Sequence, residues 1–494
     1  MRDLILALDQ GTTGSTALLL NRRGRVVGQG YAQLPQHYPR PGWVEHRPEE
    51  LLRTTHSAIG RALDGARAAA GRLAAIGITN QRETTLLWDR RTGRPVANAI
   101  VWQCRRTAPQ CEALRAQGHE PDIRRRTGLV LDAYFSGTKL RWLLEHVRGA
   151  AAAARRGGLA FGTVDTWLIW HLTGGRAHLT DETNASRTLL YNIHTHRWDP
   201  ALLRLLKIPG AVLPEVRPPR ADFGVTVRRG RVPAGLPILG VAGDQQASMV
   251  GHGCLSPGSA KNTYGTGCFL LLHTGRRAVR SRHGLITTVV YAPGGSAYAL
   301  EGSVFIAGAA IQWLRDALRL IRRAEDSEAI ARRVGDTDGV YVVPAFVGLG
   351  APYWDMDARG AVIGLTRGST RDIVVRATLE SLAYQTRDVV EAMERDSGVR
   401  LGRLQVDGGA ARNDWLMQFQ ADLLGIPVQR PAMVANTGKG AGLLAGVGLG
   451  WWSPAQLPAF VGRPERVFRP QMTRRERDRR YAGWRAAVER VRTR

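Results

Sequence analysis

A carboxylate followed by a turn of glycine and threonine residues stands near the start of the chain. Asp9 ends an alternating apolar stretch, residues 11–16 form the turn, and a second apolar stretch, 17–20, follows it. Glycines let the backbone approach a ligand closely, hydroxyl and N–H groups suit phosphate oxygens, and a strand-end carboxylate can hold Mg²⁺ through water. The pattern predicts a hairpin with a phosphate-binding tip. The alternative is an ordinary hairpin with a polar turn.

Two further groups of charged residues follow predicted strands. Arg82 and Glu83 come directly after LAAIGITNQ, and Asp244 lies between an apolar strand and the start of a helix, flanked by Gly243 and Gln245. α/β proteins place ligand-binding groups at the carboxyl ends of such strands. Arg82 and Glu83 are therefore candidate ligand groups or a surface salt bridge, and Asp244 is a functional acid or a helix cap.

The second half of the chain repeats the opening pattern. Residues 260–272 again read as strand, Gly/Thr turn and strand, which indicates an internal duplication. Gly308 and Gln312 lie at the start of a predicted helix, and the turn 407–410 is expected to place N–H groups at a helix N-terminus, a ready anion or nucleotide site. In the first half, Tyr134 stands at the start of another predicted helix.

Length and composition favour a large cytosolic protein. A chain of 494 residues exceeds the usual size of one hydrophobic core, so we expect two domains. The opening run is interrupted by Asp9 and the later run 441–452 is too short to cross a bilayer, so neither a secretion signal nor a membrane span is expected. Four scattered cysteines argue against a zinc site and against a disulfide framework.

The formal charge of +27 would ordinarily suggest nucleic acid or an anionic membrane as a partner. However, only four of the 69 basic residues are lysine, and arginine is spread through the whole chain, which indicates a bias in residue usage. The densest basic segment, 463–494, has Trp484 and Val488 near helical spacing, and we interpret it as an amphipathic helix with a solvated face. We expect neither nucleic acid nor membrane as a partner.

Two segments, YFSGTKLRWLLEH and GLTRGSTRDIVVRATLES, resemble the diagnostic segments of the FGGY carbohydrate kinases. The resemblance covers nearly the full chain. It implies the duplicated ATPase core shared by actin, heat-shock chaperones and sugar kinases: two ribonuclease H-like α/β domains, residues 1–251 and 252–494, with a central cleft. Within the family, the most similar members are those that phosphorylate glycerol, as judged from DQGTTGST, GWVEH, GITNQRETT, AIVWQCRRT, TGLVLDAYFSGTK, GTVDTWLIW, TDETNASRT, GDQQA, AKNTYGTGCF, GLGAPYWD and VDGGAARN.

The resemblance further implies ATP-dependent transfer of a phosphoryl group to glycerol, giving sn-glycerol 3-phosphate, in a cytoplasmic homo-oligomer, a dimer or a tetramer. Asp244 would accept the proton of the attacking hydroxyl, and Asp9 together with Asp244 would bind Mg²⁺. The implied glycerol-binding residues are Arg82, Glu83, Tyr134, Asp244 and Gln245, with Phe269 against the carbon face. The implied ATP-binding residues are Thr12, Thr13, Gly14, Thr266, Gly267, Gly308, Gln312, Gly409 and Asn413.

Two segments depart from the family pattern. The first turn usually reads GTTSSR, but here Thr16 stands where the family has an arginine near the phosphates. A segment that resembles ETTALGAA reads ANTGKGAG, which adds Lys439 as either a phosphate-binding or a solvated side chain. Two rival functions therefore remain open: a kinase for another polyol or a ketose, and a non-catalytic protein that binds ATP or nucleic acid.

Overall fold

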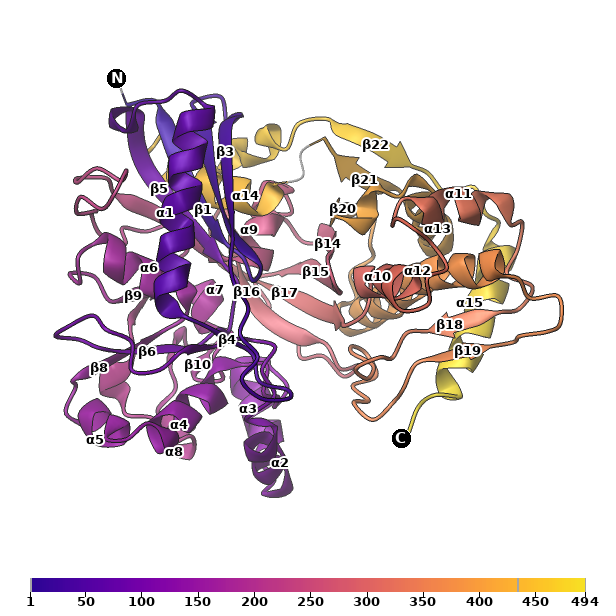
Figure 1. Cartoon of the computed structure of the whole chain (residues 1–494), viewed down its shortest axis with the longest axis horizontal. Helices are drawn as coiled ribbons and strands as arrows, with labels where there is room; N and C mark the ends of the chain where they lie inside the picture. The colour runs from indigo at the N-terminus through magenta and orange to yellow at the C-terminus, as the bar shows by residue number, and fades with distance from the viewer. Residues whose placement is uncertain (1, 433–434, 494) are drawn as a thin grey trace. The chain divides into compact units, whose positions relative to one another are not determined.

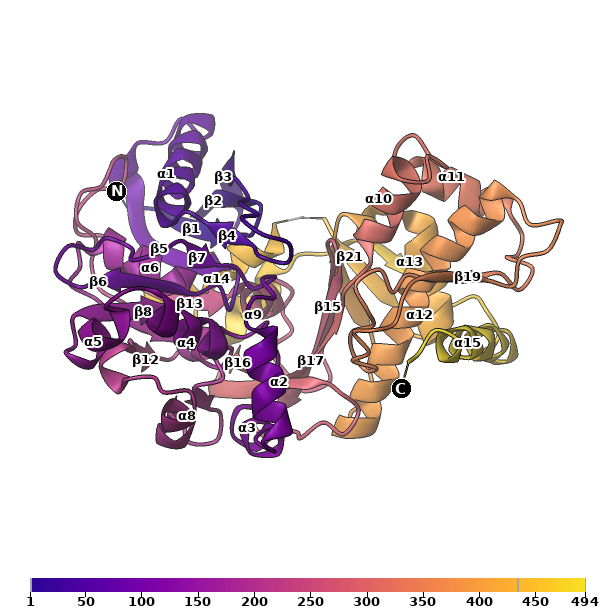
Figure 2. The same ribbon diagram turned by 60° about the horizontal axis from the view of Figure 1, so that its bottom comes forward.

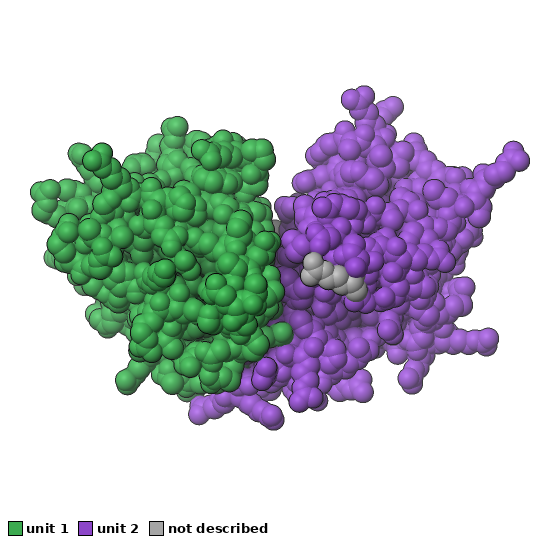
Figure 3. Space-filling model, turned by 90° about the horizontal axis from the view of Figure 1, so that it is seen from below, with its two compact units in different colours: residues 1–255, 288–298, 435–461 green, residues 256–287, 299–434, 462–494 purple. Residues whose placement is uncertain are grey.

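The computed structural model describes residues 2–432 and 435–493. By its internal contacts the chain divides into two units, which Figure 3 shows in different colours. Unit 1 comprises residues 1–255, 288–298 and 435–461, and unit 2 comprises residues 256–287, 299–434 and 462–494. The short segments 288–298 and 435–461 are therefore far from the rest of unit 1 in sequence.

Unit 1 is built on a five-stranded sheet of order β13-β5-β1-β2-β3. β1 (Leu4–Gln10) pairs antiparallel with β2 (Gly14–Asn21), and β2 pairs antiparallel with β3 (Val26–Gln33). On the other side, β5 (Leu73–Asn80) runs parallel to β1, and β13 (Ile238–Gly243) runs parallel to β5. The carboxyl ends of β1, β5 and β13 consequently lie along one edge of the sheet.

Helices cover both faces of this sheet, because β1 is apolar on both sides (Figures 1 and 2). Leu4, Leu6 and Leu8 join a buried cluster with α1 (Pro48–Gly65) and α6 (Val164–Leu172). Ile5 and Ala7 join a second cluster with α9 (Asp244–Gly251) and α14 (Asn436–Gly448).

α14 packs so closely on the sheet and on α9 that glycine is required at both contacts. A Cβ atom on Gly77 of β5 would lie 2.2 Å from the carbonyl oxygen of Ala441, and one on Gly440 would lie 1.9 Å from that of Ala247. The many glycines and alanines of α14 thus permit its close packing.

The remaining elements of unit 1 are short. The strands are β4 (Glu45–His46), β6 (Leu86–Asp89), β7 (Ala99–Ile100), β8 (Leu159–Gly162), β9 (Leu179–Asp181), β10 (Tyr191–Asn192), β11 (Arg197–Trp198) and β12 (Glu215–Arg217). The helices are α2 (Ala108–Ala116), α3 (Glu120–Thr127), α4 (Ser136–His146), α5 (Ala150–Arg155), α7 (Glu182–Ala185) and α8 (Pro200–Leu205).

The second sheet has the order β16-β17-β15-β14-β20-β21-β22. Within it, β14 pairs antiparallel with β15 and parallel with β20, as β1 does with β2 and β5. The order β21-β20-β14-β15-β17 thus repeats β13-β5-β1-β2-β3, and the predicted duplicated α/β architecture is confirmed. The strands are β14 (Ala260–Tyr264), β15 (Cys268–Gly275), β16 (Ile286–Ala292), β17 (Gly295–Val304), β20 (Leu404–Gly408), β21 (Val428–Pro431) and β22 (Pro464–Phe468), with β18 (Tyr341–Val343) and β19 (Ala361–Ile363) forming a separate pair.

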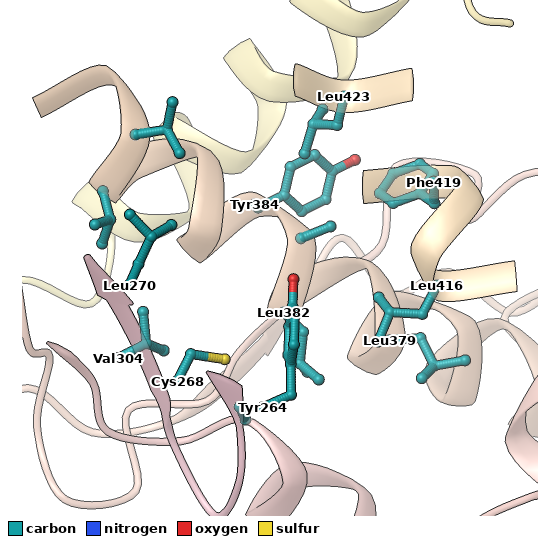
Figure 4. Close-up of a cluster of buried hydrophobic side chains, with 14 of the residues drawn as sticks. Tyr264, Cys268, Leu270, Val304, Leu379, Leu382, Tyr384, Leu416, Phe419 and Leu423 are labelled. Atoms are coloured by element: carbon teal, nitrogen blue, oxygen red, sulfur yellow. The ribbon is translucent and has the colours of Figure 1, made fainter. Parts of the chain in front are cut away.

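The core of unit 2 surrounds α12 (Arg371–Ser397). Thr370 caps its first turn and Gly398 ends it in the left-handed conformation. Figure 4 shows side chains of α12 and α13 (Asp414–Leu424), among them Leu382, Tyr384 and Phe419, packed with side chains of the sheet. The other helices of unit 2 are α10 (Gly308–Asp316), α11 (Asp326–Arg333) and α15 (Arg474–Glu489).

The predicted C-terminal amphipathic helix is α15. Its Tyr481 hydroxyl and Trp484 indole N–H donate to the Asp388 carboxylate of α12, at 2.6 and 2.8 Å. Trp484 and Val488 are buried, while the arginines of its outer face pair with nearby acids. The basic face of this helix is therefore partly neutralised. Among the described residues, no helix is long and apolar enough to cross a membrane.

Candidate active site

Arg82 and Asp244 meet at the edge of the unit 1 sheet. Because β5 and β13 run parallel, with Asn80 opposite Gly243, the residues that follow these strands are neighbours. The Arg82 Nε atom lies 3.0 Å from Asp244 Oδ1. A Cβ atom on Gly243 would lie 2.7 Å from Arg82 Cγ, so the glycine before Asp244 leaves space for the arginine. Gln245 follows Asp244 in the first turn of α9 and is buried.

Glu83 is held in an unusual backbone conformation beside this pair. Its φ angle is 62°, a region in which a residue with a side chain is strained, and such strain concentrates at functional sites. Its carboxylate lies 3.8 Å from Arg82 Nε and accepts a 2.6 Å hydrogen bond from Arg187 Nε. The Ser136 hydroxyl donates to its carbonyl at 3.0 Å. The Arg82 guanidinium can donate to a ligand hydroxyl, and the buried Glu83 and half-buried Asp244 carboxylates can accept from an adjacent one.

Arg187 is a residue of this site that the sequence analysis does not single out. It is fully buried, pairs with Glu83, and its guanidinium lies 5.7 Å from the ring centre of Tyr134. It stands in the string TDETNASRT, but no spacing in the sequence relates it to Glu83. Only the fold brings the two residues together.

Tyr134 lies two residues before the start of α4 and is half-buried. The buried Lys139 amine donates to the carbonyl oxygens of residues 133, 134 and 135, which fixes the start of the helix. The Tyr134 ring packs edge-on against Trp102 with centroids 5.6 Å apart. The Trp102 indole N–H donates to the Thr12 hydroxyl at 2.9 Å, so one tryptophan contacts both the tyrosine and the first turn.

Asp9 lies at the end of β1 on the same sheet edge. Burial and the negative charge of Asp244 raise the pKa of its carboxyl to about 7. The carboxylates of Asp9 and Asp244 repel each other in a partly desolvated site. Such a pair suits a hard divalent cation, because Mg²⁺ binds one or two carboxylates and keeps much of its water. The residues present therefore fit Mg²⁺.

The two predicted phosphate turns have the expected positions between paired strands. In unit 1, Thr12 and Thr13 connect β1 to β2, which begins at Gly14. In unit 2, Thr266 and Gly267 connect β14 to β15. Phe269 is half-buried on β15 and belongs to unit 2, whereas the other predicted glycerol-binding residues belong to unit 1.

The remaining predicted nucleotide residues lie in unit 2. Gly308 is the first residue of α10, and Gln312 is exposed one turn later. Gly409 follows β20 and is also exposed. Between Gly409 and α13 there is a short 3₁₀ turn, so the Gly-Gly turn does not itself begin an α-helix. Asn413 caps α13 instead, because its side-chain oxygen accepts from the N–H of Leu416 at 2.9 Å.

A hollow of about 380 Å³ opens beside this turn, at the carboxyl ends of β20 and β21. Both cationic and acidic side chains line it. The lining residues are Val406, Asp407, Gly408, Ala411, Arg412, Arg430, Pro431 and Glu465.

Lys439, one of the departures from the family pattern, is neither solvated nor extended toward the first turn. It is 4% exposed within α14, and its amine donates to the carbonyl oxygen of Phe460. Burial lowers its pKa. Thr16, the other departure, lies opposite Asp9 on one side and Tyr31 on the other.

The chain matches known proteins along its whole length. Residues 4–251 match the N-terminal domain and residues 260–449 the C-terminal domain of the FGGY family of carbohydrate kinases. A protein of Symbiobacterium thermophilum named glycerol kinase is 58% identical over 489 residues, covering 99% of this chain and 98% of that protein. One of Desulfitobacterium hafniense with the same name is 55% identical over 492 residues, covering 99% of this chain and all of that protein.

Among solved structures, the crystal structure of Plasmodium falciparum glycerol kinase with ADP superimposes with a TM-score of 0.93. It is 35% identical, and the match covers 99% of this chain and 98% of that one.

Proposed function

The chain belongs to the FGGY family of carbohydrate kinases, and from this membership we propose that it transfers the γ-phosphoryl group of ATP to glycerol, giving sn-glycerol 3-phosphate and ADP. The observation that carries the proposal is the buried Arg82 beside Asp244 and Glu83, in a chain similar over its full length to proteins named glycerol kinase. A small polyol offers adjacent hydroxyls that such a set can bind through both donors and acceptors.

We propose that glycerol is bound by Arg82, Glu83, Tyr134, Asp244 and Gln245, with Phe269 against its carbon atoms. Arg187 supports this set by holding Glu83, and Trp102 does so by packing on Tyr134. A site built to hydrogen-bond several hydroxyls discriminates strongly against analogues that lack one, because its buried polar groups then remain unpaired.

In the proposed reaction a terminal hydroxyl oxygen of glycerol attacks the γ-phosphorus in line. The bond from the γ-phosphorus to the oxygen that bridges it to the β-phosphate breaks, and its electron pair leaves with ADP. The hydroxyl proton passes to the Asp244 carboxylate, which acts as the general base. Arg82 holds that carboxylate in place through its 3.0 Å contact, and positioning of this kind provides most of the rate enhancement in phosphoryl transfer.

The proposed nucleotide site uses both turns. Thr12, Thr13, Gly14, Thr266 and Gly267 would bind the phosphates, and Gly308, Gln312, Gly409 and Asn413 would surround the nucleoside. Asp9 and Asp244 would hold Mg²⁺, which when bound neutralises charge on the phosphate oxygens. The hollow beside Gly408 supports a ligand at this end of β20.

An acceptor panel tests the proposal. ADP release is measured in a coupled assay with glycerol, dihydroxyacetone, erythritol and xylulose at equal concentrations, against a blank without acceptor. Glycerol is expected to give the highest kcat/KM. Turnover with glycerol no higher than the blank would refute the proposal, and a preference for xylulose would favour the rival activity of a ketose kinase.

The role of Asp244 is tested by Asp244→Asn, with Asp64→Asn as a matched control on the exposed surface of α1. Loss of a general base costs about 10³-fold in kcat. Asp64 pairs with Arg231 at the surface, so its variant is expected to keep the rate of the unsubstituted protein. Unchanged turnover of Asp244→Asn would contradict the assignment.

A further inference from the structure

A chain of hydrogen bonds behind the first phosphate turn involves residues that have no role in the reaction described above. We call Gln36, His46, Gln81 and Thr84 the turn network. His46 ends the string GWVEH, while Gln81 and Thr84 directly flank Arg82 and Glu83 in sequence. His46, Gln81 and Thr84 are buried, and Gln36 is half-buried.

Main-chain contacts determine the orientation of the first amide. The Gln36 Nε2 atom lies 2.7 Å from the carbonyl oxygen of Thr12 and 3.1 Å from that of Leu34. Because carbonyl oxygens only accept, this atom is the amide nitrogen, and Gln36 Oε1 is left as an acceptor.

The orientation of Gln36 in turn determines the proton position on His46. His46 Nε2 lies 3.0 Å from Gln36 Oε1, so this ring nitrogen carries the hydrogen and Nδ1 accepts. The donor to Nδ1 is Gln81 Nε2 at 3.4 Å, which also donates to the Gly11 carbonyl at 3.1 Å. The Thr84 hydroxyl donates to Gln81 Oε1 at 2.9 Å, which completes the network.

The network therefore binds the carbonyl oxygens of the turn and not its N–H groups. The carbonyls of Gly11 and Thr12 face Gln81 and Gln36. In contrast, the main-chain N–H groups of Thr12 and Thr13 donate to no acceptor among residues 2–432 and 435–493. Successive N–H groups left free in this way form a site for anionic oxygens.

We propose that His46 is a positioning residue for the phosphoryl donor: by joining Gln36 to Gln81 it fixes the carbonyl side of the turn and so presents the N–H groups of Thr12 and Thr13 to the phosphates of ATP. The inference rests on the proposed function, because it assigns the nucleotide phosphates to this turn.

Histidine suits this position because one neutral imidazole donates at one nitrogen and accepts at the other. The charged form would donate at both nitrogens and would oppose the N–H of Gln81. Burial and the nearby His37 lower the pKa of His46 to about 4, so the ring is neutral at physiological pH. The partners of His46 in the turn network, Gln36 and Gln81, are uncharged. His37 lies outside the network and bonds to Glu50.

Affinity for ADP, measured by calorimetry without an acceptor substrate, tests the inference. His46→Leu removes both ring hydrogen bonds, and it is expected to weaken ADP binding on the order of ten-fold and to raise the KM for ATP similarly. The dissociation constant for glycerol is expected to change by less than about two-fold, because Gln81 and Thr84 still bond to each other. His46→Gln keeps a donor and an acceptor and is expected to recover part of the lost affinity.

His37→Gln is the matched control. This histidine lies in the same segment, but it bonds to Glu50 and not to the turn network, so ADP affinity is expected to be unchanged. If His46→Leu does not fold, Gln36→Met provides a second test at a half-buried position, because it removes the link between His46 and the Thr12 carbonyl and leaves the contact of His46 with Gln81.

ADP affinity equal to that of the unsubstituted protein in His46→Leu or Gln36→Met would overturn the inference. Equal weakening of ADP and glycerol binding would also overturn it, because that result indicates a general structural role. If the proposed function is wrong, the unsubstituted protein would bind ADP but would not phosphorylate glycerol. The comparison of ADP affinities between the unsubstituted protein and its variants would still decide the role of His46.

Discussion

The turn of residues 11–14 in unit 1 and the turn of residues 265–267 in unit 2 are both closed by a hydrogen bond between glycines. Gly11 N–H donates to the Gly14 carbonyl at 2.9 Å, and Gly265 N–H donates to the Gly267 carbonyl at 2.8 Å. The second turn is shorter by one residue, and it has Thr263 where the first has Asp9. Duplication has thus kept the turn and changed its charged neighbour.

The two turns also differ in what supports them. At the first turn, the Leu34 N–H donates to the Thr13 carbonyl at 2.9 Å, and the side chains of Gln36, Gln81 and Trp102 make the contacts to Thr12 and Gly11. Main-chain groups hold the second: the N–H groups of Gly308 and Ala309 at the start of α10 donate to the carbonyls of Gly265 and Thr266, at 3.0 and 3.1 Å. The first turn should therefore be adjustable through surrounding side chains, whereas the second should depend on glycine.

The largest loss of kcat/KM is expected for Gly267→Ala. The added Cβ would lie 2.2 Å from the Val304 carbonyl and 2.9 Å from that of Phe305, and main chain cannot move aside as a side chain can. Displacing a binding turn by about an ångström can cost about 10²-fold in kcat/KM, measured by the coupled assay. In the control, Gly265→Ala, the nearest atom to the new Cβ lies 3.7 Å away, and we expect a loss of less than about three-fold. Equal losses in both variants would contradict the view that main-chain crowding at Gly267 causes the loss.

The second largest expected effect is a pH dependence of kcat/KM for ATP, caused by Asp9 beside the first turn. The second turn has Thr263 at the equivalent position, which does not titrate in this range. Because the pKa of Asp9 is raised to about 7, its carboxyl is protonated below that pH and ionised above it. For a single group with this pKa, kcat/KM for ATP is expected to rise about ten-fold from pH 6 to pH 8. Asp9→Asn should be slower but nearly independent of pH over this range. A profile unchanged by Asp9→Asn would show that another group titrates.

Gly14→Ala is the counterpart of Gly267→Ala in the first turn, with a smaller expected effect. Its Cβ would lie 2.4 Å from the end of the Tyr31 ring, but Tyr31 is 46% exposed and can rotate away. We expect kcat/KM to fall about five-fold, chiefly because the Tyr31 hydroxyl loses its hydrogen bond to the Thr13 carbonyl. Replacing Tyr31 by alanine as well should cost little more. Additive losses in the double variant would exclude this coupling.

The smallest effect is expected from Thr16→Arg, which restores the arginine of the family pattern opposite Asp9. An added charge-assisted contact should lower the KM for ATP about three-fold. A KM that stays the same would indicate that the side chains around the first turn already compensate. Lys439 is not a candidate for this compensation, because its amine bonds to the Phe460 carbonyl.

The sequence was sufficient to predict the local architecture. Alternation and turn residues indicated the strands on either side of the first turn, and the spacing of Trp484 and Val488 indicated α15, because these signals act between near neighbours in sequence. The repeat at residues 260–272 similarly indicated the duplication.

The residue that the sequence analysis missed and the predictions that failed depend on contacts between distant residues or on backbone details. Arg187 joins Glu83 across 104 positions, and no local pattern encodes that distance. The 3₁₀ turn after Gly409 separates the glycine from α13, although the sequence is equally compatible with a helix that starts at once. Lys439 is buried because α14 packs against its neighbours through glycines, a contact that composition suggests only in general terms.

Product identification tests the central claim most directly. Uniformly ¹³C-labelled glycerol and ATP are incubated with the protein, the phosphate ester is observed by NMR, and its configuration is determined with a dehydrogenase specific for the sn-3 enantiomer. The account predicts one product, sn-glycerol 3-phosphate, formed in equal amount to ADP and absent with Asp244→Asn. ADP release without a glycerol phosphate, or a mixture of enantiomers, would contradict it.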